Sequence, residues 1–139
     1  MVLFDIEELG LTSYVSKNMD IKRIEHDYFV EWRLIERGIP GESFFAFGKL
    51  NEDFPLDEDM ETMFAAHNID TSHFVPSEIG GRIYPYQDYT DGEIIDGYFE
   101  LFEHDGKWFY KHYHGEYTEY NGGVYHERLD MFMDSIEWH

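Results

Sequence analysis

Apolar and charged residues alternate most regularly along residues 22–36. Alternation with a period of two is typical of a β-strand that turns one face to a core and the other to water. The segment Arg37-Gly38-Ile39-Pro40-Gly41 then predicts a turn, because glycine permits positive φ and proline fixes φ. Residues 43–50 are apolar on both sides. The pattern therefore predicts an antiparallel hairpin of strands 22–36 and 43–50.

A second hairpin is predicted around His104-Asp105-Gly106-Lys107. Asp-Gly favours the type I′ turn that joins antiparallel strands tightly. The flanking strands are expected at residues 94–103 and 107–114, and residues 116–120 extend the same sheet. The long connection over 69–93 is expected to contain a short strand at residues 82–86, because long unstructured connections are uncommon in small domains.

Three segments have helical spacing or helix-start signals. Residues 57–68 place apolar side chains at i, i+3, i+4 and i+7, and carboxylates crowd the first turn, where they favour the positive end of the helix dipole. A final helix is predicted over 124–137 after Asn121-Gly122-Gly123. A short helix is expected over 5–17 with Asp5 as N-cap. The inner face of the final helix is Tyr125, Leu129, Phe132, Met133 and Ile136.

These elements predict an α+β fold. We expect a mainly antiparallel sheet of about four to six strands, built from the two hairpins and packed with two to three helices. The chain has 139 residues, which favours one domain spanning residues 1–139.

Composition excludes several classes of function. The formal net charge is −20 and there is no cysteine. Direct binding to nucleic acid or to an anionic membrane is disfavoured by this charge, and thiolate metal sites, disulfides and cysteine nucleophiles are excluded. The acidic start lacks the basic region of a signal peptide, and no apolar stretch has the length of a membrane span. The expected location is the cytoplasm.

Residues 51–105 hold most of the negative charge, with fifteen acids against Arg82 alone. Solubility or adaptation to high salt would explain such an excess. A surface complementary to a basic partner is an alternative explanation, because closely spaced carboxylates can imitate a row of phosphates. Binding of metal or small cations is a third alternative.

Tyrosines lie in the same acidic block and provide contact area with a hydroxyl that still forms hydrogen bonds. The alternative interpretation is that these tyrosines clamp the loop that carries them onto the sheet. The expected partner-binding residues are Asp57, Glu58, Asp59, Glu61, Tyr84, Tyr86, Asp88, Tyr89, Asp91 and Glu93.

His112 and His114 are separated by one residue on a predicted strand, so both rings point to one face and could bind one metal ion. Packing or hydrogen bonding on the sheet is the simpler interpretation. The stretch from Gly106 through His112-Tyr113-His114 to Glu119 resembles the first motif of the cupin family. That resemblance implies a divalent metal held by the two histidines and Glu119, with a later histidine such as His126 completing the site. The second cupin motif, with its Pro-X-Gly and histidine, is missing.

The leading hypothesis is a binding protein without catalytic activity or cofactor. It would occlude a basic, nucleic-acid-binding surface on a partner protein such as a nuclease, as immunity proteins and phage anti-CRISPR or anti-restriction proteins do. This comparison is an analogy from charge and size. The alternative is a small enzyme or binding domain that uses one divalent transition metal at the cupin-like motif. A third reading is a module whose aromatic residues line a ligand pocket.

Overall fold

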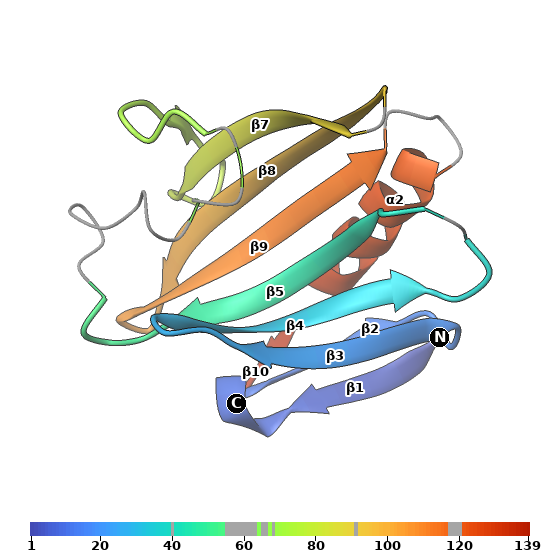
Figure 1. Ribbon diagram of the computed structural model, residues 1–139. Helices are drawn as coiled ribbons and strands as arrows, with labels where there is room; N and C mark the ends of the chain where they lie inside the picture. Colours follow the sequence, from blue (N-terminus) through green and yellow to red (C-terminus); the bar gives the residue numbers. More distant parts are fainter. Residues whose placement is uncertain (40, 55–63, 65–66, 68, 91, 117–120) are drawn as a thin grey trace.

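Strands dominate the computed structural model, which describes residues 1–39, 41–54, 64, 67, 69–90, 92–116 and 121–139 (Figure 1). Strands hold 56% of the residues and helical segments 13%. The strands are β1 (Val2–Ile6), β2 (Leu11–Val15), β3 (Met19–Glu25), β4 (Phe29–Glu36), β5 (Phe44–Leu50), β6 (Val75–Pro76), β7 (Arg82–Thr90), β8 (Glu93–His104), β9 (Lys107–Glu116) and β10 (Glu137–Trp138). The helical elements are the 3₁₀ turn η1 (Glu7–Leu9) and the α-helix α2 (Asn121–Asp134).

The predicted α+β class with two to three helices is wrong, because the fold is mostly β with a single α-helix among the described residues. Seven strands form a large sheet in the order β3-β4-β5-β9-β8-β7-β6, and β1, β2 and β10 form a small one. All paired neighbours in both sheets run antiparallel. Most of the helix predicted over 57–68, including Asp57, Glu58, Asp59 and Glu61, lies outside the described residues.

Residues 5–15 belong to a hairpin of β1 and β2, not to the helix predicted over 5–17. β1 pairs with β2 from Val2↔Val15 to Ile6↔Leu11, and η1 joins them. Gly10 ends η1 at φ +70°, a left-handed conformation that glycine adopts without steric cost. The apolar spacing resembled a helix because η1 is itself helical, but the flanking residues obtain their hydrogen bonds across strands.

The single strand predicted over 22–36 is two strands. β3 and β4 pair antiparallel from Met19↔Glu36 to Glu25↔Val30, and His26 N–H donates to the Phe29 carbonyl at 2.8 Å across the turn. The turn contains neither glycine nor proline, so the alternation runs through it without a visible break.

Other elements agree with their predictions. β8 and β9 meet at Asp105 and Gly106, whose φ values of 52° and 76° are those of the expected type I′ turn. β4 pairs with β5 as expected. β7 is longer than the strand predicted over 82–86. α2 begins and ends three residues earlier than predicted, since Glu137 and Trp138 pair with β2 instead of continuing the helix.

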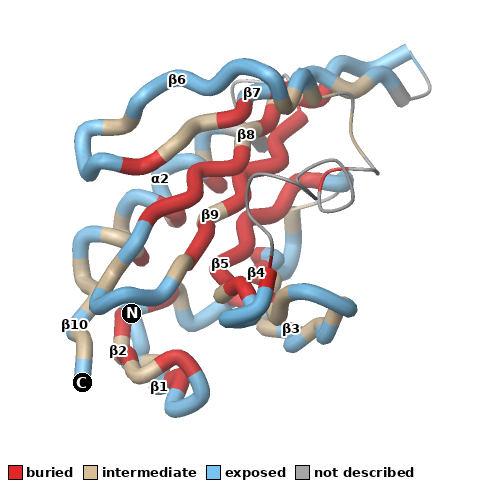
Figure 2. Tube along the Cα trace, turned by 90° about the vertical axis from the view of Figure 1, so that its left-hand side faces the viewer, coloured by how far each residue is buried: buried red, intermediate tan, exposed pale blue. Residues whose placement is uncertain are grey.

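The central strands β5, β8 and β9 are largely buried on both faces (Figure 2). One face, which we call the helix face, packs against α2 and the small sheet in an apolar cluster that includes Phe45, Phe47 and Phe132. The opposite face, called the site face, carries a second cluster in which Phe54 and Phe64 cover strand residues such as Phe99. Double burial explains why β5 is apolar on both sides.

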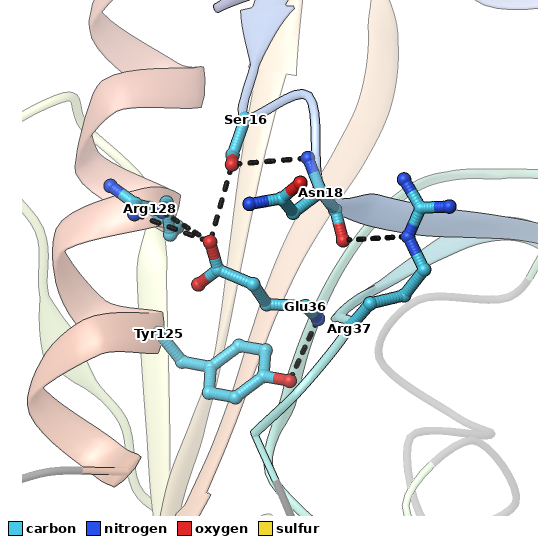
Figure 3. Close-up of polar contacts among 6 residues, drawn as sticks. All are labelled: Ser16, Asn18, Glu36, Arg37, Tyr125 and Arg128. Atoms are coloured by element: carbon cyan, nitrogen blue, oxygen red, sulfur yellow. Dashed lines mark hydrogen bonds and ion pairs between the residues drawn. The ribbon is translucent and has the colours of Figure 1, made fainter.

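A buried carboxylate at the end of β4 holds α2 in place (Figure 3). Arg128 of α2 donates to Glu36 Oε1 from Nε and Nη2 at 3.3 and 3.2 Å, and the Ser16 hydroxyl donates to the same oxygen at 3.2 Å. The Glu36 backbone N–H donates to the Tyr125 hydroxyl at 2.8 Å. Helix, large sheet and the turn after β2 therefore share one polar anchor.

Within the described part of the chain, no helix combines the length and the apolar character needed to cross a membrane.

Removing the central ring of the helix face should destabilise the fold strongly. Phe132 is fully buried, with its ring centroid 5.4 Å from that of Phe47. We expect Phe132→Ala to lower the free energy of unfolding by about 3–5 kcal/mol through lost burial and a cavity. Glu127→Ala on the exposed side of α2 is the control and should change it by less than about 0.5 kcal/mol. Urea unfolding followed by circular dichroism measures both, and similar values would contradict this packing.

Candidate functional site

Five polar side chains meet on the site face. Tyr86 and Asp88 come from β7, His112 and His114 from β9, and His67 from the connection that precedes β6. Tyr86 and Asp88 share a face, as do His112 and His114, since residues two apart on a strand point to the same face. His112, His114 and Tyr86 are buried, while His67 and Asp88 keep 15% and 23% of their side chains exposed.

An absent side chain at Gly97 lets residues of β7 and β9 meet across β8. In the sheet register Gly97 lies directly between Tyr86 and His114. The Tyr86 ring lies over Gly97, where an added Cβ would be only 2.2 Å from Tyr86 Cζ. The Tyr86 hydroxyl consequently reaches the histidines on the far side of β8.

The Tyr86 hydroxyl bridges the two histidines of β9. Its oxygen is 2.6 Å from His112 Nε2 and 2.7 Å from His114 Nδ1. Burial lowers the pKa of His112 well below its usual value, and lowers that of His114 to about 4. Burial likewise raises the pKa of Tyr86. All three groups are therefore uncharged at neutral pH.

His67 and Asp88 form the more exposed part of the cluster. His67 Nδ1 lies 2.9 Å from Asp88 Oδ2, and the His67 ring stacks on the Tyr86 ring at a centroid distance of 4.3 Å. One ligand atom each from His67, Asp88 and His114 lies within 4.8 Å of the other two. Two imidazoles and one carboxylate at this spacing are a donor set for a metal ion.

Aromatic rings stack on the imidazoles of the two histidines of β9. Phe99 stacks on His112 with 3.8 Å between centroids, and Phe44 stacks on His114 with 4.8 Å. The Arg33 guanidinium lies 4.1 Å from the centroid of Phe44 on the same side of the sheet. The rings fix the imidazole planes and exclude water from them.

A second cluster of polar side chains, from β4 and β9, lies beside these aromatic rings. Glu31 is buried and pairs with His26 at 2.7 Å and with Arg33 at 3.1 Å. Glu31 Oε2, Arg33 Nε and the Tyr110 hydroxyl are buried with no hydrogen-bond partner among the described residues. Buried polar atoms of this kind are satisfied by water or by a ligand in most proteins.

The predicted partner-binding residues do not form one described surface. Tyr84 and Tyr86 are 1% and 5% exposed, so neither ring can be a surface anchor, and Asp88 binds His67. Tyr89 is 72% exposed and Glu93 is exposed as well. Outside the described residues lie Asp57, Glu58, Asp59, Glu61 and Asp91.

The cupin-like ligand set is only partly brought together. His112 and His114 share a face, as their spacing predicts, but both rings bind Tyr86. His126 is half-exposed on α2, where it pairs with Asp130 and contacts Tyr113 on the helix face. Glu119 lies outside the described residues. The structure instead brings His67 and Asp88 to His114.

His67 lies in the segment predicted as a helix over 57–68, and Asp88 was predicted to bind a partner. The available signal was the strand alternation that places Tyr86 and Asp88 on one face. β7 and β9 each pair with β8, so the register of these pairings decides that Tyr86 and Asp88 lie beside the histidines of β9. His67 is distant in sequence from every other residue of the cluster.

Comparisons with protein-family models, with curated proteins and with solved structures find no match to this chain. The function proposed below rests on the geometry of the site.

Adding a methyl group at Gly97 should displace Tyr86. We expect Gly97→Ala to lower the free energy of unfolding by about 1–3 kcal/mol, because the buried ring has to move out of its place. Gly123→Ala in α2 is the matched control, since nothing lies within 4 Å of the new methyl group. That change should be neutral or stabilise by up to about 1 kcal/mol. Urea unfolding of both variants tests this, and equal effects would contradict the close approach.

The neutral state of His114 predicts how stability depends on pH. Its pKa of about 4 in the folded protein compares with 6.5 for an ordinary histidine. The unfolded chain binds more protons between these values, so stability falls as pH falls through them. Between pH 7 and pH 5 we expect the metal-free wild type to lose about 1–2 kcal/mol more than His114→Gln. Urea unfolding at both pH values measures this, and equal losses would show that His114 titrates normally.

Proposed function

We propose that this protein binds a divalent transition metal ion through His67, Asp88 and His114. The observation that carries the proposal is the convergence of their ligand atoms to within 4.8 Å of one another from three separate segments. Two of the ligands are on strands β7 and β9 of one sheet, and the third is in the connection that precedes β6.

The distances suit a metal of zinc's size after small side-chain movements. Ligand atoms about 2.1 Å from a tetrahedral ion are about 3.4 Å from each other. His67 Nδ1 and Asp88 Oδ2 are already 2.9 Å apart, and the widest separation in the group has to close by at most about 1.4 Å. The partly exposed His67 and Asp88 side chains have the freedom to make this adjustment.

The donor set favours a first-row transition metal over calcium or magnesium. Imidazole nitrogen suits zinc, iron, copper and nickel, whereas calcium and magnesium prefer oxygen ligands throughout. Three protein ligands leave at least one coordination position for water or substrate, as in catalytic metal sites. The net charge of −20 attracts cations toward the protein.

The metal proposal predicts one bound ion per chain. Chelator-treated wild type should bind Zn²⁺ at a ratio of 1:1 in calorimetric titration and melt at a higher temperature when zinc is present. His67→Ala and Asp88→Asn should each weaken binding by at least about tenfold, because the first removes a ligand nitrogen and the second replaces the charged carboxylate by a neutral amide. Cobalt substitution gives a second measurement through visible absorption bands.

His126→Ala and Glu119→Gln are the matched controls, and they test the cupin-like ligand set at the same time. Both should leave the zinc affinity unchanged. Loss of binding in these controls, with His67→Ala and Asp88→Asn unaffected, would favour the cupin-like set. A wild-type protein that binds neither zinc nor cobalt would overturn the proposal.

Occlusion of a basic partner stays a prediction of the charge distribution. Among the ten predicted partner-binding residues, Tyr89 and Glu93 are exposed in the described part of the chain. Capture of a basic protein whose binding weakens with salt would support that function independently of metal.

A further inference from the structure

We infer that Tyr86 and His112 select the tautomer of His114 that can bind the metal. This inference rests on the proposed function, and it concerns two residues that are not themselves ligands. Both are buried, and both belong to one chain of hydrogen bonds that ends at His114.

The Tyr86 hydroxyl has one proton to donate, but two histidine nitrogens lie beside its oxygen. Tyr86 Oη is within hydrogen-bond distance of His112 Nε2 and of His114 Nδ1, and the described residues offer it no third partner. A tyrosine hydroxyl donates one hydrogen bond, and a neutral imidazole has one N–H and one acceptor nitrogen. If both imidazoles donated to the oxygen, the buried hydroxyl proton would have no acceptor among the described residues, which is costly. One histidine therefore donates to the oxygen while the other accepts from it.

Two arrangements satisfy this requirement. In the first, His114 Nδ1–H donates to Tyr86 and the Tyr86 O–H donates to His112 Nε2. In the second, His112 Nε2–H donates to Tyr86 and the Tyr86 O–H donates to His114 Nδ1. The two differ in which nitrogen of His114 carries its proton.

Only the first arrangement is compatible with metal binding. Because the Tyr86 hydroxyl occupies His114 Nδ1, Nε2 is the nitrogen of this ring that remains for a metal ion. With the proton on Nδ1, Nε2 keeps its lone pair, whereas in the second arrangement Nε2 is protonated. His112 accepts the hydroxyl proton in the first arrangement and thereby holds it away from His114. Partners of this kind, which orient a ligand through its other nitrogen, commonly change metal affinity 10–100-fold when removed.

Replacing Tyr86 or His112 by phenylalanine separates the roles of these two residues. Tyr86→Phe removes the oxygen that accepts from His114 Nδ1–H, and the zinc affinity should fall by about 10–100-fold. His112→Phe leaves the hydroxyl with His114 Nδ1 as its remaining acceptor, which favours the wrong tautomer. The affinity should therefore fall at least as far as in Tyr86→Phe, and the double variant should be no weaker than His112→Phe.

His112→Gln is the conservative variant, because its amide oxygen can accept the hydroxyl proton; it should recover part of the affinity lost in His112→Phe. Tyr98→Phe is the control. Tyr98 is on the same sheet but contacts Tyr113 and His126 on the helix face, and removing its hydroxyl should leave zinc binding unchanged.

Nitrogen-15 NMR of the wild-type imidazoles tests the tautomers without any substitution. On adding zinc we expect His114 to show a protonated Nδ1 and His112 an unprotonated Nε2, although His112 is not a ligand. Zinc binding that leaves His112 Nε2 protonated, or that is equally tight in Tyr86→Phe, would overturn this inference alone. A wild type that binds no zinc would overturn the proposed function and this inference with it.

Discussion

Burial of β5, β8 and β9 on both faces is the constraint on which the rest of the structure depends. Each of these strands contributes alternate residues to two different cores, so a one-residue slip in register would exchange them. The helix face requires α2 and the small sheet to cover it. The site face requires Phe54 and Phe64, and the same covering connection supplies His67.

The candidate site follows from this double layer and from one missing side chain. Gly97 leaves room on β8 for the Tyr86 ring, whose hydroxyl then reaches His112 and His114. Burial keeps His112 and His114 neutral, whereas His67 and Asp88 stay partly exposed. A neutral imidazole is the form that binds a metal ion.

The net negative charge of the chain and the polar cluster of the site face bear on the proposed metal site in different ways. The strong negative charge raises the local concentration of cations, but it does not select among them. At the proposed metal site, selection would come from the two imidazoles beside Asp88, since nitrogen donors discriminate against calcium and magnesium. The charge that predicted a basic protein partner is equally suited to a metal ion.

The sequence by itself determined the elements whose signals are local. The Asp105-Gly106 turn, the strands beside it and the buried residues Tyr125, Leu129 and Phe132 of α2 follow from backbone preference and periodicity. The tertiary structure alone decided that residues 5–17 lie in a hairpin and that residues 22–36 divide into two strands, because β2 and β4 are held by their second neighbours β10 and β5 and not by a strong local turn signal. It also decided the site. His-X-His marks one strand, but its partners His67 and Asp88 come from segments whose proximity depends on strand order and register, which no local pattern encodes.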